Sequence, residues 1–262
     1  ARLAGQIAGI VDLFEQVDVH KEGAISWEQV SSHLIETGMS ADEAYSLDNI
    51  KSYEPSTVPD KSKHESPVDK LIYLDKLDSL ACISTNLRSF SLYDPQRCTV
   101  QSTFSGHRGS VVDCCYVESL GQIASSAADM TVSFWDPTTE HFRGKVSAKE
   151  VQTSLEYEPQ SRCLFSGGID GTLCRWSLGS LEHSLADTRK GHHKQAINDL
   201  IAINDIDMLA SASSDGSILM WDLELMKPMR TFRAHKKGAH KLAYSDDYRL
   251  LLSSGLDQEA CV

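Results

Sequence analysis

The chain has 262 residues, of which 41% are hydrophobic and 7% are aromatic, and this is the composition of an ordinary globular protein with enough chain for a sizeable core. Its formal net charge of −12 argues against a nucleic acid backbone as the main partner. No apolar run approaches the length of a membrane-spanning helix. We therefore expect its partners to be other proteins, with neither nucleic acid nor a membrane among them.

Residues 1–50 predict a helix, a loop and a second helix. Apolar residues recur at helical spacing in the first segment, at Leu3, Ile7, Ile10, Val11 and Phe14. A loop runs from Asp18 to Gln29, with Gly23 in its sixth position. This loop resembles the EF-hand, in which a glycine makes the sharp turn at that position.

The EF-hand resemblance implies calcium ligands at Asp18, Glu22, Ser26 and Gln29. His20 stands where a carboxylate or an amide is expected, and Gln29 offers one oxygen where a glutamate would offer two. A neutral nitrogen is a poor ligand for a hard cation. The sequence thus predicts a weak or vestigial calcium loop in a module retained mainly for packing, and no other cofactor.

Residues 51–67 predict a linker, and a repeated unit fills residues 68–262. Pro55, Pro59 and Pro67 lie among Lys and Ser residues in the linker. In the following part an aspartate recurs at intervals of 41, 45 and 42 residues, as Asp129, Asp170, Asp215 and Asp257. Six residues after the first three of these stand Trp135, Trp176 and Trp221. An earlier and weaker unit ends at Tyr93 and Asp94.

Serine and histidine recur at fixed distances before the same aspartates. An apolar run ends in serine four residues earlier, at Ser125, Ser166, Ser211 and Ser253. A histidine stands 22 residues earlier in three units, as His107, His193 and His235. The segments between them alternate apolar and polar residues, which is the pattern of half-buried strands.

With four strand patterns in each unit, the repeat resembles the WD-repeat family, whose units build the blades of a β-propeller. This resemblance implies a mainly β fold with four blades and part of a fifth, preceded by the small α-helical EF-hand module. Rings of this family usually have more blades. We therefore expect the ring to be incomplete in this chain, and both chain ends to be cuts through a longer protein.

The WD-repeat resemblance also implies a buried hydrogen-bond network in the blades. Its expected members are His107, Ser125, Asp129, Trp135, His193, Ser211, Asp215, Trp221, His235, Ser253 and Asp257. Buried polar groups are costly unless paired, so such residues among apolar strands should satisfy one another. A Ser-His-Asp set also suggests a catalytic triad, but a nucleophile needs one activated serine and an oxyanion hole. Because the set recurs from unit to unit, we predict a structural network, no catalytic residues and no enzyme.

Three further features qualify the pattern. Ala148 stands where the third unit should have its histidine, so this blade is expected to keep only part of the network.

The seven cysteines include no Cys-x-x-Cys pair and predict small apolar side chains in a reducing compartment. A short basic cluster predicts a solvated loop between blades, and it consists of Arg233, His235, Lys236, Lys237 and Lys241.

An EF-hand followed by WD repeats resembles the EF-hand and WD-repeat proteins associated with ciliary and flagellar axonemes. That resemblance implies a non-enzymatic scaffold for protein–protein interactions, located in the cytoplasm as part of the cytoskeleton of a cilium or flagellum. The alternative is a calcium-responsive adaptor, in which the EF-hand regulates what the propeller binds. Propellers of one sequence pattern serve in many pathways, so the blades do not identify the partner.

Overall fold

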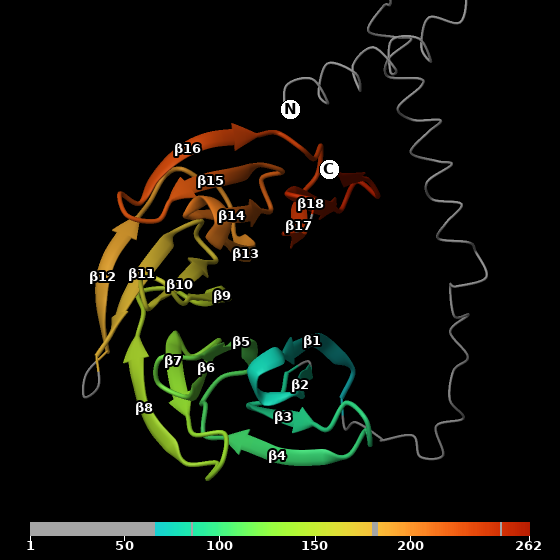
Figure 1. Cartoon of the computed structure of the whole chain (residues 1–262), viewed down its shortest axis with the longest axis vertical. Coiled ribbons are helices and arrows are strands. Elements are labelled where there is room, and N and C mark those ends of the chain that lie inside the picture. The colour runs from blue at the N-terminus through green and yellow to red at the C-terminus, as the bar shows by residue number, and fades with distance from the viewer. Residues whose placement is uncertain (1–65, 85, 180–182, 247) are drawn as a thin grey trace, which may run out of the picture. The chain divides into compact units, whose positions relative to one another are not determined.

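A computed structural model describes residues 66–84, 86–179, 183–246 and 248–262 as five antiparallel sheets (Figure 1). We call the sheets blades 1 to 5 in chain order. Blade 1 contains β1 (Val68–Leu74), β2 (Ser79–Ser84), β3 (Ser89–Tyr93) and β4 (Val100–Ser105). Blade 2 contains β5 (Val111–Val117), β6 (Gln122–Ala127), β7 (Thr131–Trp135) and β8 (Phe142–Ser147).

The remaining blades repeat the same order of strands. Blade 3 contains β9 (Gln152–Glu158), β10 (Cys163–Gly168), β11 (Leu173–Leu178) and β12 (His183–Arg189). Blade 4 contains β13 (Ile197–Ile203), β14 (Met208–Ser213), β15 (Ile218–Asp222) and β16 (Lys227–Phe232). Blade 5 contains β17 (Ala239–Ser245), β18 (Leu250–Gly255) and β19 (Ala260–Cys261). The prediction of a mainly β fold with four blades and part of a fifth is confirmed for the described residues.

Tight turns connect the strands within each blade. Short 3₁₀-helices at Asp75–Leu77 and Asn204–Ile206 join the first strand to the second in blades 1 and 4. Gly216 lies in the turn between β14 and β15 with φ of 83°, and a Cβ atom there would lie 2.4 Å from the carbonyl oxygen of His235. Glycine is therefore required at this turn, where blade 4 meets the loop that enters blade 5.

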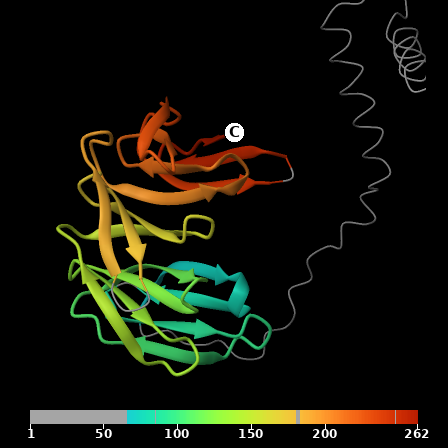
Figure 2. The same ribbon diagram turned by 60° about the vertical axis from the view of Figure 1, so that its left-hand side comes forward.

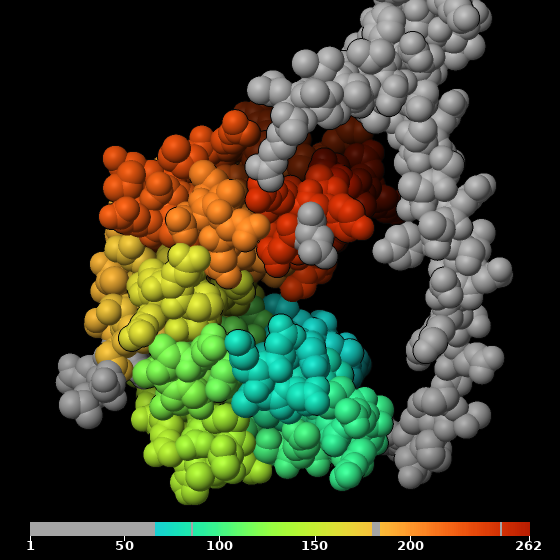
Figure 3. Space-filling view, in the orientation of Figure 1, coloured from blue at the N-terminus to red at the C-terminus, as the bar shows by residue number. Residues whose placement is uncertain are grey.

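The hydrophobic core lies between consecutive blades. Each of four apolar clusters joins residues of two neighbouring blades, and Trp135, Trp176 and Trp221 are almost fully buried in three of them. The space-filling view shows neighbouring blades in close contact (Figure 3). Because burial of one large apolar side chain contributes about 1.5–3 kcal/mol, this packing accounts for much of the stability of the stack.

The first strand of every blade lies nearest a common axis, and the fourth strands of blades 1 to 4 lie on the outer rim (Figure 1). A turned view shows the blades following one another from blade 1 to blade 5 (Figure 2). Strands β5, β9 and β13 have the same sequence of buried and exposed positions. Equivalent positions of different blades can therefore be compared directly.

The outward faces of blades 1 and 5 have no described sheet packed against them. Leu71 of β1 is 59% exposed, whereas Leu155 and Leu200 at the same register of blades 3 and 4 are each 5% exposed. On the opposite face, Leu252 of β18 is 40% exposed, while Ala210 at its register in blade 4 is fully buried.

Candidate functional site

The predicted polar residues of blade 2 lie together beneath the loop that leads into β5. The Nε2 atom of His107 lies 2.8 Å from Oγ of Ser125, and Nε1 of Trp135 donates to the same hydroxyl over 2.7 Å. On its other side, Nδ1 of His107 lies 3.4 Å from Oδ2 of Asp129. The serine thus joins the histidine on the entering loop to the tryptophan on β7.

The direction of these hydrogen bonds follows from their donors. Trp135 can only donate, so Oγ of Ser125 accepts from it. The Asp129 carboxylate beside Nδ1 of His107 favours a proton on that nitrogen, so Nε2 accepts the hydrogen of Ser125. The histidine is then neutral, with its proton on Nδ1 facing Asp129. Burial lowers the pKa of His107 despite the opposing effect of Asp129, which agrees with a neutral ring. Ser125 is fully buried and its hydroxyl is occupied, so it cannot reach a substrate.

Blades 4 and 5 place the corresponding residues in similar positions. In blade 4, Nε2 of His193 lies 2.6 Å from Oγ of Ser211, which accepts from Nε1 of Trp221 over 2.8 Å. Here Nδ1 of His193 lies 3.1 Å from Oγ of Ser217 and 3.5 Å from Oδ2 of Asp215. In blade 5, Nε2 of His235 lies 3.0 Å from Oγ of Ser253, and Nδ1 lies 3.0 Å from Oδ1 of Asp257.

Blade 3 uses a residue that the sequence spacing did not indicate. Trp176 donates to Oγ of Ser166 over 2.7 Å, and Ser166 donates to Oε1 of Gln152 over 2.6 Å. The histidine that would link Ser166 to Asp170 is absent, as predicted, but Gln152 at the start of β9 accepts from the serine where a histidine accepts in the other blades. A glutamine reaches the serine from a position four residues after Ala148.

The aspartates hold the turns on which the histidines lie. Oδ2 of Asp129 accepts from the backbone N–H of Arg108 over 2.7 Å, and Oδ1 accepts from the hydroxyl of Thr131 over 2.6 Å. Burial alone would raise the pKa of Asp129, but these hydrogen bonds outweigh it and lower the pKa to about 2. The carboxylate is thus charged at neutral pH and ties the entering loop to the next turn.

A second set of polar residues follows the first strands along the axis. Each blade has one such residue, 12 positions before the serine that is hydrogen-bonded to tryptophan or histidine, or before Cys82 in blade 1. In chain order these residues are Lys70, Asp113, Ser154, Asp199 and Lys241. Each follows a shift of register between the first and second strands of its blade, and such bulges re-aim side chains. The fixed spacing is a sequence signal that could have revealed this set.

Two aspartates of this set connect blades. Oδ2 of Asp113 accepts from the backbone N–H of Leu155 in blade 3 over 2.8 Å. Oδ2 of Asp199 accepts in the same way from Leu242 in blade 5 over 2.8 Å. Their other oxygens pair with lysines, Asp113 with Lys70 at 2.6 Å and Asp199 with Lys241 at 2.8 Å.

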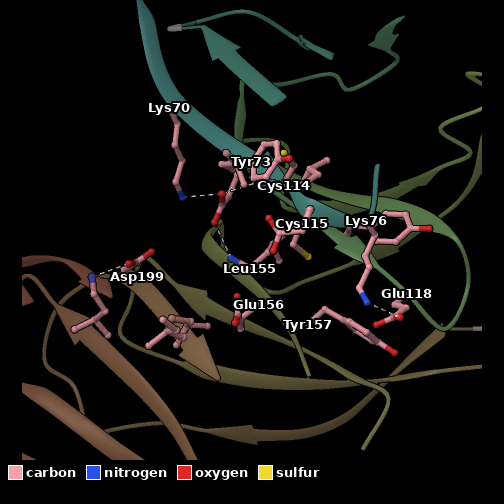
Figure 4. A pocket seen from close by; sticks show the side chains of 18 of the residues that line it. Lys70, Tyr73, Lys76, Cys114, Cys115, Glu118, Leu155, Glu156, Tyr157 and Asp199 are labelled. Carbon is pink, nitrogen blue, oxygen red and sulfur yellow. Dashed lines mark hydrogen bonds and ion pairs between the residues drawn. The ribbon is translucent and has the colours of Figure 1, made fainter. Parts of the chain in front are cut away.

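These residues line a cavity of about 430 Å³ between the first strands (Figure 4). Its wall also contains Glu156 of β9, whose Oε1 accepts from the backbone N–H of Ala202 over 3.0 Å. Burial of the carboxyl group raises the pKa of Glu156 to about 8, although the Ala202 N–H lowers it, and Asp199 and Asp113 add to the rise. The cavity thus holds an acid that is largely protonated at neutral pH.

Other sequence predictions fare differently. The predicted calcium residues Asp18, Glu22, Ser26 and Gln29 lie outside the described residues, so calcium binding stays a prediction. Within the described part of the chain, no group of three His, Cys, Asp or Glu side chains could hold a metal ion, no helix is long and apolar enough to cross a membrane, and no disulfide joins any of the seven cysteines.

The basic cluster is only partly a solvated loop. Arg233, Lys236 and Lys237 are exposed between β16 and β17, as predicted. The prediction is wrong for His235, which is buried because it belongs to the network of blade 5. Lys241 lies on β17 and pairs with Asp199.

Comparison with known proteins agrees with the repeat. The family model described as "WD domain, G-beta repeat" matches residues 98–136, 139–177, 183–222 and 226–262. The chain is similar to Cilia- and flagella-associated protein 337 B of Tetrahymena thermophila, with 21% identity over 97% of this chain and 24% of that protein.

Two further relatives match the blades. Pre-rRNA-processing protein IPI3 of Yarrowia lipolytica is 25% identical over 69% of this chain and 48% of its own length. Target of rapamycin complex subunit LST8 of Saccharomyces cerevisiae is 25% identical over 62% of this chain and 54% of its own length. The chain therefore spans between about a quarter and about half of the relatives that it matches.

Proposed function

Because this chain belongs to the WD-repeat family, we propose that it is a non-enzymatic scaffold for protein–protein interactions in a ciliary or flagellar assembly. The observation that carries the proposal is its similarity to a cilia- and flagella-associated protein over 97% of the chain. Under this proposal the protein lies in the cytoplasm, bound to the cytoskeleton of the axoneme. Similarity to a subunit of the target of rapamycin complex supports partners within a multi-protein complex.

The outer rim supports binding of proteins. Blades 1 to 3 each carry a large apolar residue on the outermost strand that is at least 43% exposed and lies opposite Tyr93, Trp135 or Trp176, namely Val100, Phe142 and Leu185. In blade 4 Pro228 takes this position opposite Trp221, and the exposed Met229 follows it. Single exposed apolar residues are common on monomers, but a series at the same place in successive blades forms a repeated binding surface.

The buried networks support the absence of catalysis. Ser125 and Ser211 are fully buried, and each hydroxyl already accepts from a tryptophan. Nucleophilic attack would require the serine oxygen to reach a bound substrate. We therefore propose that His107, Ser125, Asp129 and their equivalents serve to hold the blades.

Localisation and detergent extraction in a ciliated cell test this proposal. The full-length protein would be tagged at its own locus, and cilia would be isolated and treated with non-ionic detergent to remove membrane and soluble matrix. We expect the tagged protein to remain with the axoneme and to be released only by high salt, as for a protein-bound component. Absence from cilia, or complete release by detergent, would show that the ciliary part of the proposal is wrong.

A further inference from the structure

We propose that the cavity between the first strands binds a basic side chain, lysine or arginine, of a partner protein, and that Glu156 is the acidic group that pairs with it. This inference rests on the proposed scaffold function and names the chemistry of the partner.

The first argument is that the fold does not require an acid at this position. In the register of the sheets, Glu156 lies opposite Phe165, and the same position in the other blades is occupied by Ile72, Cys115, Ile201 and Ala243. Four of five blades therefore use an apolar or thiol side chain here. Because a buried carboxyl group is costly, its presence in blade 3 calls for a function outside the packing of the blades.

The second argument is that the lysines of the cavity already have partners. Lys70 pairs with Asp113, Lys241 with Asp199, and Lys76 with Glu118 at 3.2 Å. Glu156 has a single hydrogen bond, from the Ala202 backbone to Oε1, and its Oε2 has no hydrogen-bond partner among the described residues. Figure 4 shows Glu156 on the wall of the cavity, and no dashed line reaches it.

The third argument concerns the kind of cation. No group of three ligating side chains in the described residues could hold a metal ion, which disfavours a divalent cation. Aromatic rings also line the cavity, from Tyr73, Tyr116 and Tyr157. An ammonium or guanidinium group gains from both a carboxylate and an aromatic face. A volume of about 430 Å³ lies within the usual range for ligand pockets of roughly 300–1,000 Å³.

The surroundings of Glu156 give this binding a characteristic dependence on pH. The titratable groups that interact with its carboxyl group are Asp113 and Cys115 on β5, Asp199 on β13 and Lys241 on β17. Burial raises the pKa of this carboxyl group to about 8, so a cation that pairs with its charged form near neutral pH must displace a proton. Affinity for a basic side chain should therefore rise as the pH increases from about 6 to about 9.

Binding of short peptides to the full-length protein tests the inference. The probes are Gly-Gly-Arg-Gly-Gly and Gly-Gly-Lys-Gly-Gly with blocked ends, and their neutral counterparts contain citrulline or acetyl-lysine. Calorimetry at about pH 8.5 should show at least about tenfold tighter binding of a basic peptide than of its neutral counterpart. The preference should shrink at about pH 6.5, and binding should release protons in buffers of different ionisation enthalpy.

Two matched variants locate the site. Glu156→Gln keeps an oxygen that can accept from Ala202, and it should abolish the preference for the basic peptide. Glu224→Gln removes the same charge from an exposed position between β15 and β16, and it should leave the preference unchanged. The inference is overturned if no basic peptide is preferred, or if the preference survives in Glu156→Gln.

The comparison between charged and neutral peptides on the unmodified protein requires no variant, so a failure of Glu156→Gln to fold would not remove the test. The outcome is also separate from the proposed function. If the peptides fail while the tagged protein remains on the axoneme, only the inference about Glu156 is wrong. If the peptides bind as expected but the protein is absent from cilia, the basic partner lies elsewhere and the ciliary proposal is wrong.

Discussion

Two adjacent serines of β6 offer a direct test of the network. Ser125 and Ser126 are both fully buried. Ser125 is bonded to His107 and Trp135, whereas Oγ of Ser126 has no hydrogen-bond partner in the described structure. Replacement of each by alanine removes one oxygen from the same strand at equal burial. The two variants thus differ mainly in the hydrogen bonds that they lose.

The magnitudes follow from those partners. Ser125→Ala removes two hydrogen bonds and leaves the Trp135 N–H and a nitrogen of His107 buried without a partner, so we expect a loss of about 2 to 5 kcal/mol. Ser126→Ala removes an unpaired hydroxyl and should change the stability by less than about 0.5 kcal/mol, or increase it. In a unit of this size, where 1 kcal/mol corresponds to about 2 to 4 °C, the first change should lower the Tm by about 4 to 20 °C.

Thermal and urea denaturation, followed by tryptophan fluorescence and circular dichroism, measure both variants against the parent protein. Near-ultraviolet circular dichroism in the native state checks that the fold is retained. Equal midpoints for Ser125→Ala and Ser126→Ala would refute the reasoning, because burial alone, and not the network, would then determine the effect of a serine in this strand.

Three further predictions follow from the same structure. Asp215→Ala should cost roughly 1 to 3 kcal/mol in urea denaturation, and Asp170→Ala should cost less, because blade 3 has no histidine for its aspartate to orient; an equal loss would contradict this. The pKa of Glu156 is about 8 in the folded state and about 4.5 in the unfolded chain. Between these two pH values the folded state binds more protons than the unfolded chain, so the free energy of unfolding falls as the pH rises from about 4.5 to about 8. Glu156→Gln should therefore raise the stability by about 1 to 2 kcal/mol at about pH 9, after screening in the open cavity, and by much less at about pH 5; thermal melts at both pH values decide. The segment 1–50 should bind calcium weakly in calorimetry, and Gln29→Glu with His20→Asp should tighten binding by restoring two carboxylates; submicromolar affinity of the unmodified segment would instead favour the calcium-responsive adaptor.

Much of the fold could be predicted because the same spacing of residues recurs in several units, and each unit independently indicates the same strands. Asp129, Asp215 and Asp257 each have a serine and a histidine at constant distances, and one alignment of these units places strands, turns and buried tryptophans together. Repetition turns a weak local strand pattern into a strong one, since each unit must bury its faces against the next.

Gln152 could not be predicted from the same spacing. Counting 22 residues back from Asp170 gives Ala148, which has no side-chain acceptor. The acceptor for Ser166 is Gln152, whose longer side chain extends from a different backbone position. A fixed spacing captures residues that share a backbone position. It does not capture a different side chain that brings an acceptor to the same point in space.

The cavity was missed for another reason. Asp113, Asp199 and Lys241 share a position 12 residues before their serine, but pairing of Asp199 with Lys241 depends on how two blades face each other. Within one strand, Glu156 looks like an ordinary polar residue in an alternating pattern. Only the arrangement of the blades shows that it lines a shared cavity in which the lysines are paired with other carboxylates.

A cross-linking map of the native assembly tests the central proposal most directly. Intact cilia that carry the tagged full-length protein would be treated with a membrane-permeable lysine-reactive cross-linker, and linked peptides would be identified by mass spectrometry. We predict links from exposed lysines of this chain, such as Lys145, Lys227 and Lys237, to one recurrent set of axonemal proteins. Links confined to the chain itself, or to proteins of the soluble matrix, would contradict a scaffold built into the axoneme.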